Sequence, residues 1–319
     1  MQAFRSIVVN AFMELVRQPF FLVLMTVSAA FIGFLGSIYY FALGEDVKLV
    51  KDSGLAVVFL SGLFGAVFSA SSSVAREIHS GTALAVMSKP IGRVPFLLGK
   101  YVGLTGALSL LTLVNVVALL VSTKIAFDAY GEPNLRALAF YYGAMALAFV
   151  VGAGINYFLD RPFVGNTVFA LAIFLTVAFL VIAFLNDKGG LQPFGADVDW
   201  RLIPAGILLL FALWALAALA LACTTRLDMV ATLAICSGFF LVGIMSDYLF
   251  GTGDQQGDKM ASMAYAVTPN WQVFWMSDAL EEGKTIPWAY VGRAFEYAAG
   301  YIVMTLALAM ALFQDRELR

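Results

Sequence analysis

Few residues of this chain have the type and spacing that metal, redox or nucleophilic chemistry requires. The 319-residue sequence holds two cysteines, Cys223 and Cys236, and one histidine, His79. The cysteines form no CxxC pair and are too few for a disulfide framework. A single histidine cannot supply two axial haem ligands, and it disfavours a multi-histidine zinc site. We therefore expect no metal or cofactor in this chain, and we interpret both cysteines as small core residues.

The sequence also lacks the motif that would bind ATP. A phosphate-binding loop requires GxxxxGK[ST], in which backbone amides and the lysine hold the phosphates. The nearest stretch, from Gly92 to Gly99-Lys100-Tyr101, has the wrong spacing and no Ser or Thr after the lysine. The chain is therefore not expected to be an enzyme by itself. Its net charge of −2 offers no basic surface to a nucleic acid.

The segment 74–96 combines capping, helix-breaking and charged residues at informative spacing. Gly81 weakens the continuation of an incoming helix, and Ser80 or Thr82 can cap a short new one. Pro90 ends that helix, because the residue before a proline is pushed out of helical geometry. Its apolar face would comprise Ala83, Leu84, Val86 and Met87. These features predict a short helix across the membrane plane, clamped between two spans, so that a push on it moves both spans.

This segment closely resembles the coupling-helix signature of permease subunits of type-2 ATP-binding cassette (ABC) transporters. The matching residues are Glu77, Gly81-Thr82, Ser88-Lys89-Pro90, Arg93 and Phe96-x-x-Gly99-Lys100. The end of the chain looks like that family's closing segment as well, in Thr268-Pro269-Asn270-Trp271 and in the run from Phe313 to Leu318. The resemblance extends over most of the chain outside its middle.

The resemblance implies a permease subunit of an exporter, with ATP bound by a separate ATPase subunit and a second permease completing the transporter as a homodimer or heterodimer. Glu77 would be a polar anchor at the end of the second span, and Gly81 and Thr82 would form the bend. Leu84 and Met87 would fill a groove of the ATPase. Lys89 and Arg93 would face acidic groups or lipid phosphates, although ordinary interfacial charge explains them equally well. We interpret His79 as a solvated loop residue rather than a proton switch.

The amino-acid composition indicates that a bundle of transmembrane helices holds the segment 74–96 in place. Hydrophobic residues make up 61% of the chain and charged residues 13%, whereas soluble domains have roughly 45–50% and about 25%. Eight stretches approach or exceed the roughly 20 apolar residues that span a bilayer as a helix. These are 20–43, 54–73, 97–121, 138–159, 164–185, 203–222, 229–250 and 289–313. Because transmembrane strands alternate over about ten residues, the long continuous runs predict an all-α, polytopic membrane protein with about eight spans.

We divide the chain into an N-terminal segment 1–19, a transmembrane permease domain 20–313 and a tail 314–319. Apolar residues from Phe4 to Val16 recur at helical spacing and predict an amphipathic helix in the membrane interface, with a simple start of the first span as the alternative. Since such permeases commonly have six spans, 138–185 resembles an inserted hairpin. The tryptophans in or beside the loop 251–288 indicate an interfacial anchor such as a helix at Trp271–Leu280, or else a substrate gate.

Lys and Arg are somewhat denser in 1–19, 74–96, 160–163, 223–228 and 314–319 than in the alternate connecting segments. The positive-inside rule therefore places both termini in the cytoplasm. The resemblance implies the cytoplasmic membrane of a bacterium, with the lipid bilayer as a partner.

Arg293 and Glu296 are the ionisable residues to explain within the last span. They lie three residues apart, so they can pair with each other on one helix, and Glu296 is the better candidate for a pathway residue. The spacing of Gly99 and Gly103 allows the third span to pack closely on a neighbour.

Two other functions remain open from sequence: a non-transporting anchor subunit of a larger respiratory or maturation complex, and a secondary carrier. The lack of ligating His and Cys argues against direct redox work. The lack of broken polar helices and of a chain of acidic residues in the spans argues against a proton-coupled carrier.

Overall fold

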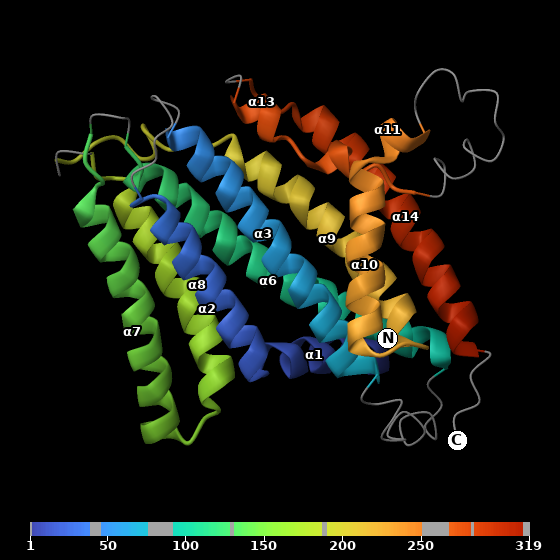
Figure 1. Ribbon diagram of the computed structural model, residues 1–319. Coiled ribbons are helices and arrows are strands. Elements are labelled where there is room, and N and C mark those ends of the chain that lie inside the picture. Colours follow the sequence, from blue (N-terminus) through green and yellow to red (C-terminus); the bar gives the residue numbers. More distant parts are fainter. Residues whose placement is uncertain are drawn as a thin grey trace.

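The computed structural model describes residues 2–38, 46–75, 92–127, 131–186, 190–250, 268–281 and 284–314. Within these ranges the protein is built of helices that run side by side in one inclined bundle (Figure 1). The described residues contain no strand, only an isolated antiparallel bridge between Leu185 and Leu191. The predicted all-α fold is therefore confirmed for the described residues.

In the part of the chain that the structure describes, six helices are long and apolar enough to cross a membrane. They are α3 (Asp46–Ala70), which continues into the π-helix η1 (Ser71–Ala75), α6 (Arg93–Ile125), α7 (Leu135–Leu159), α8 (Phe163–Ile182), α9 (Leu202–Thr224) and α14 (Trp288–Gln314). A seventh span is counted if α1 (Gln2–Val16) and α2 (Pro19–Leu35), which meet at an angle of 63°, form one broken span.

The described residues thus contain six or seven helices that could span a membrane, and the eight spans expected from sequence are not confirmed. Hydropathy located the apolar runs but not the ends of the helices within them. The first run continues beyond Leu35, where α2 ends. The run 229–250 is divided between the 16-residue helix α10 (Met229–Ile244) and the short helix α11 (Ser246–Phe250).

The helix termini gather at two opposite ends of the bundle, which we name the α1 end and the α13 end after α1 and the short helix α13 (Ser277–Glu281). The α1 end contains η1, the start of α6, the α7–α8 and α9–α10 turns and the end of α14 (Figure 1). Helices α2, α6, α8 and α10 run from the α1 end to the α13 end, and α3, α7, α9 and α14 run in the opposite direction (Figure 1). This alternation agrees with the predicted order of spans.

Helix α6 is the central element and has 33 residues. It packs against α1, α2, α3, α8 and α9. At its middle, the fully buried Asn115 accepts a hydrogen bond from Ser28 of α2 and donates one to Ser61 of α3, both at 2.9 Å. Because a polar group in apolar surroundings must find a partner, this triad fixes α2, α3 and α6 to one another.

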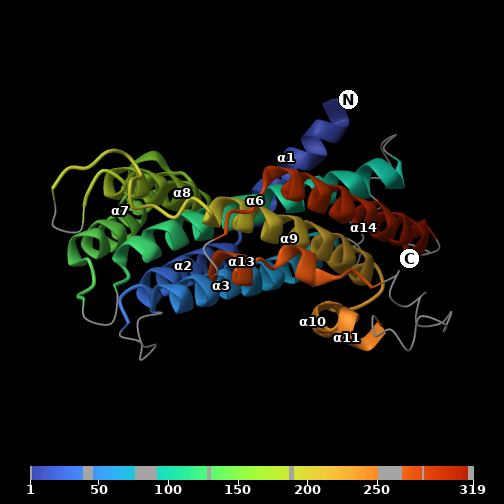
Figure 2. The same ribbon diagram turned by 90° about the horizontal axis from the view of Figure 1, so that it is seen from above.

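Helix α1 lies across the end of the bundle rather than along it (Figures 1 and 2). It buries Ala11, Leu15 and Val16 and packs on the first turns of α6. A Cβ atom on Gly103 would lie 2.6 Å from Cβ of Ala11 and 2.9 Å from the backbone nitrogen of Phe12. The glycine that was predicted to permit close packing therefore does so, and its neighbour is α1.

The helices α7 and α8 form a hairpin where the sequence predicted spans at 138–159 and 164–185; whether it is an insertion stays a prediction. Helix α7 lies at the edge of the bundle opposite α14 (Figures 1 and 2). Asp160, which follows α7, has a φ of 50° and so adopts the left-handed conformation that turns the chain toward α8.

Candidate functional site

The candidate site is built around the two ends of α3, because the segment predicted to couple to an ATPase follows directly after it. Glu77, Gly81, Thr82, Leu84, Met87 and Lys89 lie outside the described residues. Arg93 is the first residue of α6, and only its backbone is described. The structure therefore places the two helices that the segment 76–91 must join.

At the α1 end, α3 changes into the π-helix η1, which contains three consecutive serines. The hydroxyl of Ser72 donates a hydrogen bond to Oε1 of Gln18 at 3.0 Å. Oγ of Ser71, Oγ of Ser73 and Nε2 of Gln18 are buried, and they have no hydrogen-bond partner in the described structure. We name these four residues the polar junction. Such π-helical turns are frequent at functional sites, and buried polar groups without partners make this end of α3 energetically costly.

Next to the polar junction, α1 and the first turns of α6 are joined by an ion pair and by close packing. Lys100 of α6 has a side chain only 4% exposed, and its Nζ lies 2.9 Å from Oε2 of Glu14 on α1. Gly99 approaches α1 so closely that a Cβ atom would lie 2.6 Å from Cγ2 of Ile7. The helix α1 and the start of α6 are therefore joined by both packing and charge.

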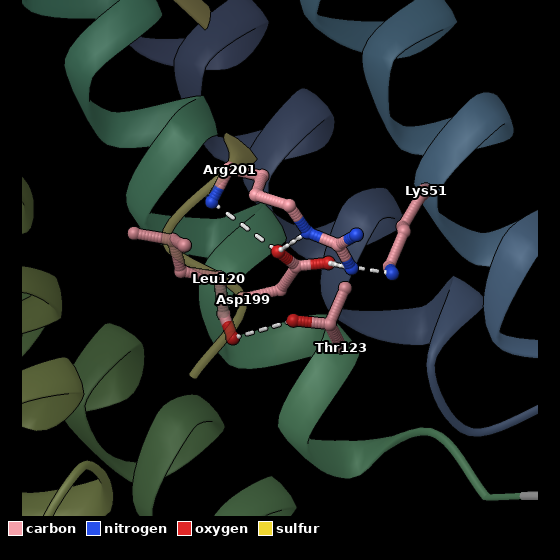
Figure 3. Close-up of polar contacts among 5 residues, drawn as sticks. All are labelled: Lys51, Leu120, Thr123, Asp199 and Arg201. Carbon is pink, nitrogen blue, oxygen red and sulfur yellow. Dashed lines mark hydrogen bonds and ion pairs between the residues drawn. The ribbon is translucent and has the colours of Figure 1, made fainter. Parts of the chain in front are cut away.

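The α13 end of α3 carries ion pairs instead. Oδ2 of Asp199, in the connection between α8 and α9, lies 2.6 Å from Nζ of Lys51 on α3 (Figure 3). The guanidinium of Arg201 donates to both carboxylate oxygens of Asp199, at 2.7 and 2.9 Å. Burial opposes ionisation of Asp199, but hydrogen bonds from Arg201 and Lys51 and the attraction of their charges outweigh it and lower its pKa to about 2.

Two further contacts at this end join α3 and α6 to the connecting segments. Nζ of Lys124, in the last turn of α6, lies 3.3 Å from Oδ2 of Asp197. Ser277 of α13 donates a hydrogen bond to Asp52 of α3. We name these pairs, together with Lys51, Asp199 and Arg201, the charge cluster.

Sequence reasoning missed the charge cluster. The sequence does contain a signal for it. Basic residues such as Lys51 and acidic residues such as Asp199 lie near the ends of different apolar runs, on the same predicted side of the membrane. Acidic residues contribute little to orientation, so they carried no weight in the positive-inside argument.

A groove of about 790 Å³ lies between α3, α9, α10 and the segment that contains the 3-10 helix η3 (Trp271–Phe274) and α13. Phe59 of α3 stacks on Phe240 of α10 with ring centroids 4.3 Å apart, and both rings line the groove. Trp275 and Lys284 also line it, and both are exposed. The lining is mainly apolar and aromatic with a positive charge at the rim, which suits an apolar or amphipathic molecule.

The structure corrects the interpretation of Trp271. The expected helix at Trp271–Leu280 is divided into η3 and α13, and Trp271 is only 3% exposed. Its indole nitrogen donates to the carbonyl of Phe239, and its ring touches Gly243 so closely that a Cβ atom there would lie 2.2 Å away. Trp271 therefore holds α10 against the bundle and does not anchor an interfacial helix, whereas Trp288 is 63% exposed.

Arg293 and Glu296 are both exposed on α14. No ion pair joins them among the described contacts. Neither lines the groove or takes part in the contacts of the charge cluster, so the described structure does not bring them into the same site as α3.

The described part of the chain contains no group of three or more His, Cys, Asp or Glu residues that could hold a metal ion. No protein-family model matches the sequence, and no curated protein matches it either. A function must therefore be argued from the residues and their geometry.

Proposed function

We propose that this chain is the membrane-spanning permease subunit of an ABC exporter, driven by a separate ATPase subunit. The observation that carries the proposal is the difference between the two ends of α3. Ion pairs hold the α13 end, although the buried carboxylate of Asp46 there has no hydrogen-bond partner in the described structure. At the α1 end the described contacts of α3 include no ion pair, and two serine hydroxyls are buried without partners. The segment 76–91 joins that α1 end to α6, so a force on the segment acts on the end of α3 that is held less firmly.

In this proposal the α1 end faces the cytoplasm, together with both termini. Closure of the ATPase subunit around ATP pushes the coupling segment, with Leu84 and Met87 seated in its surface. Arg93 begins the 33-residue helix α6, so the same push reaches the centre of the bundle. The ion pair between Lys100 and Glu14 passes the displacement on to α1.

The groove supplies a place for the exported molecule. Its wall includes Phe59 and Leu60 of α3, which is the helix that the coupling segment would displace. Tilting α3 about the charge cluster would change the distance between α3 and α10 and thus the width of the groove. We propose an apolar or amphipathic substrate that is moved outward or across the leaflets of the membrane.

Gentle purification of the chain from its native membrane tests the assignment. We expect a nucleotide-binding subunit to accompany the chain, and we expect ATP hydrolysis by that complex. An anchor subunit would bring other partners, and a secondary carrier would bring no ATPase. Either result would overturn the proposal.

Two variants test the lever itself. Glu77→Ala and Gly81→Val should reduce ATP hydrolysis by the reconstituted complex severalfold while leaving expression intact. Glu132→Gln is the matched control, because Glu132 is an exposed acid in the connection between α6 and α7, at the opposite end of the bundle. Unchanged hydrolysis in both lever variants would contradict the proposed role of the segment.

A further inference from the structure

The two cysteines of the chain, Cys223 and Cys236, are brought together by the fold. Cys223 lies in the last turn of α9, and Cys236 lies in the middle of α10, which packs against α9. Their side chains are hydrogen-bond partners, and both are free thiols. The proposed transport mechanism uses neither thiol, so their pairing asks for a separate explanation.

A tight, well-bonded turn fixes the position of α10 relative to α9. The connection 225–228 is closed by a hydrogen bond from the backbone nitrogen of Leu227 to the carbonyl of Cys223, at 2.8 Å. Oδ1 of Asp228 caps α10 by accepting from the backbone nitrogen of Ala231, at 2.9 Å. Because the turn holds both helix ends, the two thiols are kept close to each other.

The two thiols differ in exposure, which indicates different roles. Cys236 is completely buried, whereas Cys223 is partly exposed near the α1 end. Cysteines that sense oxidants are accessible and often lie next to a second cysteine that resolves the oxidised sulfur. Cys223 therefore has the position of the thiol that reacts first, and Cys236 that of the resolving thiol.

We propose that Cys223 and Cys236 form a reversible disulfide when the protein meets a hydroperoxide. The thiolate of Cys223 attacks the terminal peroxide oxygen and the O–O bond breaks, which leaves a sulfenic acid on Cys223. The departing alkoxide or hydroxide takes the proton that the thiol lost. The sulfur of Cys236 then displaces the sulfenic oxygen, which leaves as water with the thiol proton. Both sulfurs are oxidised, the peroxide is reduced, and a dithiol restores the free cysteines by exchange.

The pair is better suited to a disulfide than to a metal ion. A structural zinc site needs four ligands, and two sulfurs supply only half of them. The described ranges hold no group of three or more His, Cys, Asp or Glu residues that could complete such a site. If the α1 end faces the cytoplasm, as the proposed function requires, the disulfide would be transient, because disulfides in that compartment are usually catalytic or redox-sensing.

The helix that carries Cys236 is held to the bundle by few side chains. Among its residues only Thr232, Cys236 and Gly243 are buried, and α10 lies at the margin of the bundle (Figure 2). The same helix supplies Phe240 and Ile244 to the groove, about one and two turns beyond Cys236. A disulfide to α9 would therefore restrain one wall of the groove. An effect of this restraint on transport rests on the proposed function, whereas formation of the disulfide does not.

Peptide mapping of the wild-type chain in nanodiscs tests the disulfide. The protein is treated with hydrogen peroxide, remaining thiols are alkylated, and the chain is digested with trypsin. Cleavage after Arg226 separates the two cysteines into the peptides 202–226 and 227–259. We expect these peptides to be linked, with a mass lower by two hydrogens than their sum, and to separate on treatment with dithiothreitol. The proposal is overturned if no linked pair forms, or if the link joins two copies of the chain on a non-reducing gel.

Single variants test the two roles. Cys236→Ser should leave a sulfenic acid on Cys223 that dimedone labels, whereas Cys223→Ser should be labelled at least tenfold less, because Cys236 is buried. The matched control is the double variant Cys236→Ser/Ile235→Cys, which moves the thiol to a neighbouring position that is 43% exposed. This more accessible thiol should form no link to Cys223. Linking as fast as in the wild type, or equal dimedone labelling of the two single variants, would contradict the assigned roles.

Amide hydrogen exchange tests the restraint on α10. Oxidation of the wild type should slow exchange in 229–244 at least threefold, because opening of α10 away from α9 is hindered. Exchange in α7 is the internal control and should not change, and Cys223→Ser should show no slowing after peroxide. Unchanged exchange in oxidised wild type would refute the restraint. None of these measurements involves an ATPase subunit, so their outcome is independent of the transporter assignment.

Discussion

The two ends of α3 are fastened by different physical means. At the α13 end, Lys51 and Asp52 contact Asp199 and Ser277 through an ion pair and a hydrogen bond to a carboxylate. At the α1 end, Ser71 and Ser73 have buried hydroxyls without partners in the described structure. Among the described contacts, α3 therefore has an attachment through ion pairs at one end and a neutral one at the other, although Asp46 at the charged end also has a buried carboxylate without a hydrogen-bond partner.

This difference indicates where α3 can move at least cost. Displacing the α13 end would separate charges that are partly removed from water, which is expensive. Displacing the α1 end breaks few hydrogen bonds, and it can give the buried hydroxyls access to water or to new partners. The charge cluster is thus suited to act as a pivot, and the polar junction as the end that moves.

The largest effect is expected from breaking the pivot. Asp199→Asn removes the carboxylate that neutralises Lys51 and Arg201. Because a largely buried Lys51 is left without its partner, we expect the free energy of unfolding to fall by about 3 kcal/mol. Chemical unfolding in mixed micelles measures the change. Glu132→Gln should alter stability by less than about 0.5 kcal/mol, as is usual for an exposed residue. Equal losses in the two variants would show that the cluster is not an attachment.

The second largest loss of stability is expected where α1 packs on α6, next to the polar junction. Gly103→Val introduces a side chain where even a Cβ atom would lie 2.6 Å from Cβ of Ala11. The helix α1 must move away from α6, and we expect a loss of about 2 kcal/mol from overpacking, measured by the same unfolding experiment. Gly143→Ala on α7 is the matched control, because a Cβ atom there would meet nothing within 4 Å. That replacement should be neutral or slightly stabilising, since alanine favours a helix more than glycine does.

The ionic character of the charge cluster should make the free energy of unfolding depend on pH. The pKa of Asp199 is lowered from 3.8 to about 2 in the folded protein. A lowered pKa stabilises the fold above the unfolded value, and this stabilisation is lost as the pH falls from about 4 toward 2. At 1.36 kcal/mol per pKa unit, and allowing for solvent screening, the loss is about 1.5 kcal/mol. The stability difference between wild type and Asp199→Asn should therefore shrink across this range. A constant difference would mean that packing, not charge, explains the variant.

The contrast between the two ends also shows what the sequence could reveal. Hydropathy located the membrane-spanning runs because a span is encoded locally, in about 20 consecutive apolar residues. The close approach at Gly103 was likewise foreseeable from a glycine spacing, although the identity of its neighbour was not. By contrast, Lys51 and Asp199 are far apart in the sequence. Only the packing of α3 against the start of α9 brings them together, so no local pattern identifies them as partners.

The dependence on packing between distant segments also explains where the structure differs from the interpretation of the sequence. Trp271 has the composition of an interfacial residue, but the contact with Gly243 that buries it depends on how α10 packs. Arg293 and Glu296 were expected to pair because their spacing on a helix allows it, whereas the structure leaves both exposed. The residues with the most specific sequence signature, from Glu77 to Lys89, lie outside the described chain. Their role stays a prediction.

The smallest effect is expected at the polar junction, and its sign should be opposite to that at the pivot. Ser71→Ala and Ser73→Ala each remove a buried hydroxyl without a partner, so each variant should be more stable by up to about 1 kcal/mol. Ser72→Ala is the matched control, because its hydroxyl donates to Gln18, and its removal should cost about 1 kcal/mol. If the unsatisfied hydroxyls lower the cost of displacing α3, the stabilised variants should also hydrolyse ATP more slowly in complex with the ATPase subunit. Stabilisation without any slowing would separate the polar junction from the lever, and destabilisation in all three variants would mean that Ser71 and Ser73 have hydrogen-bond partners after all.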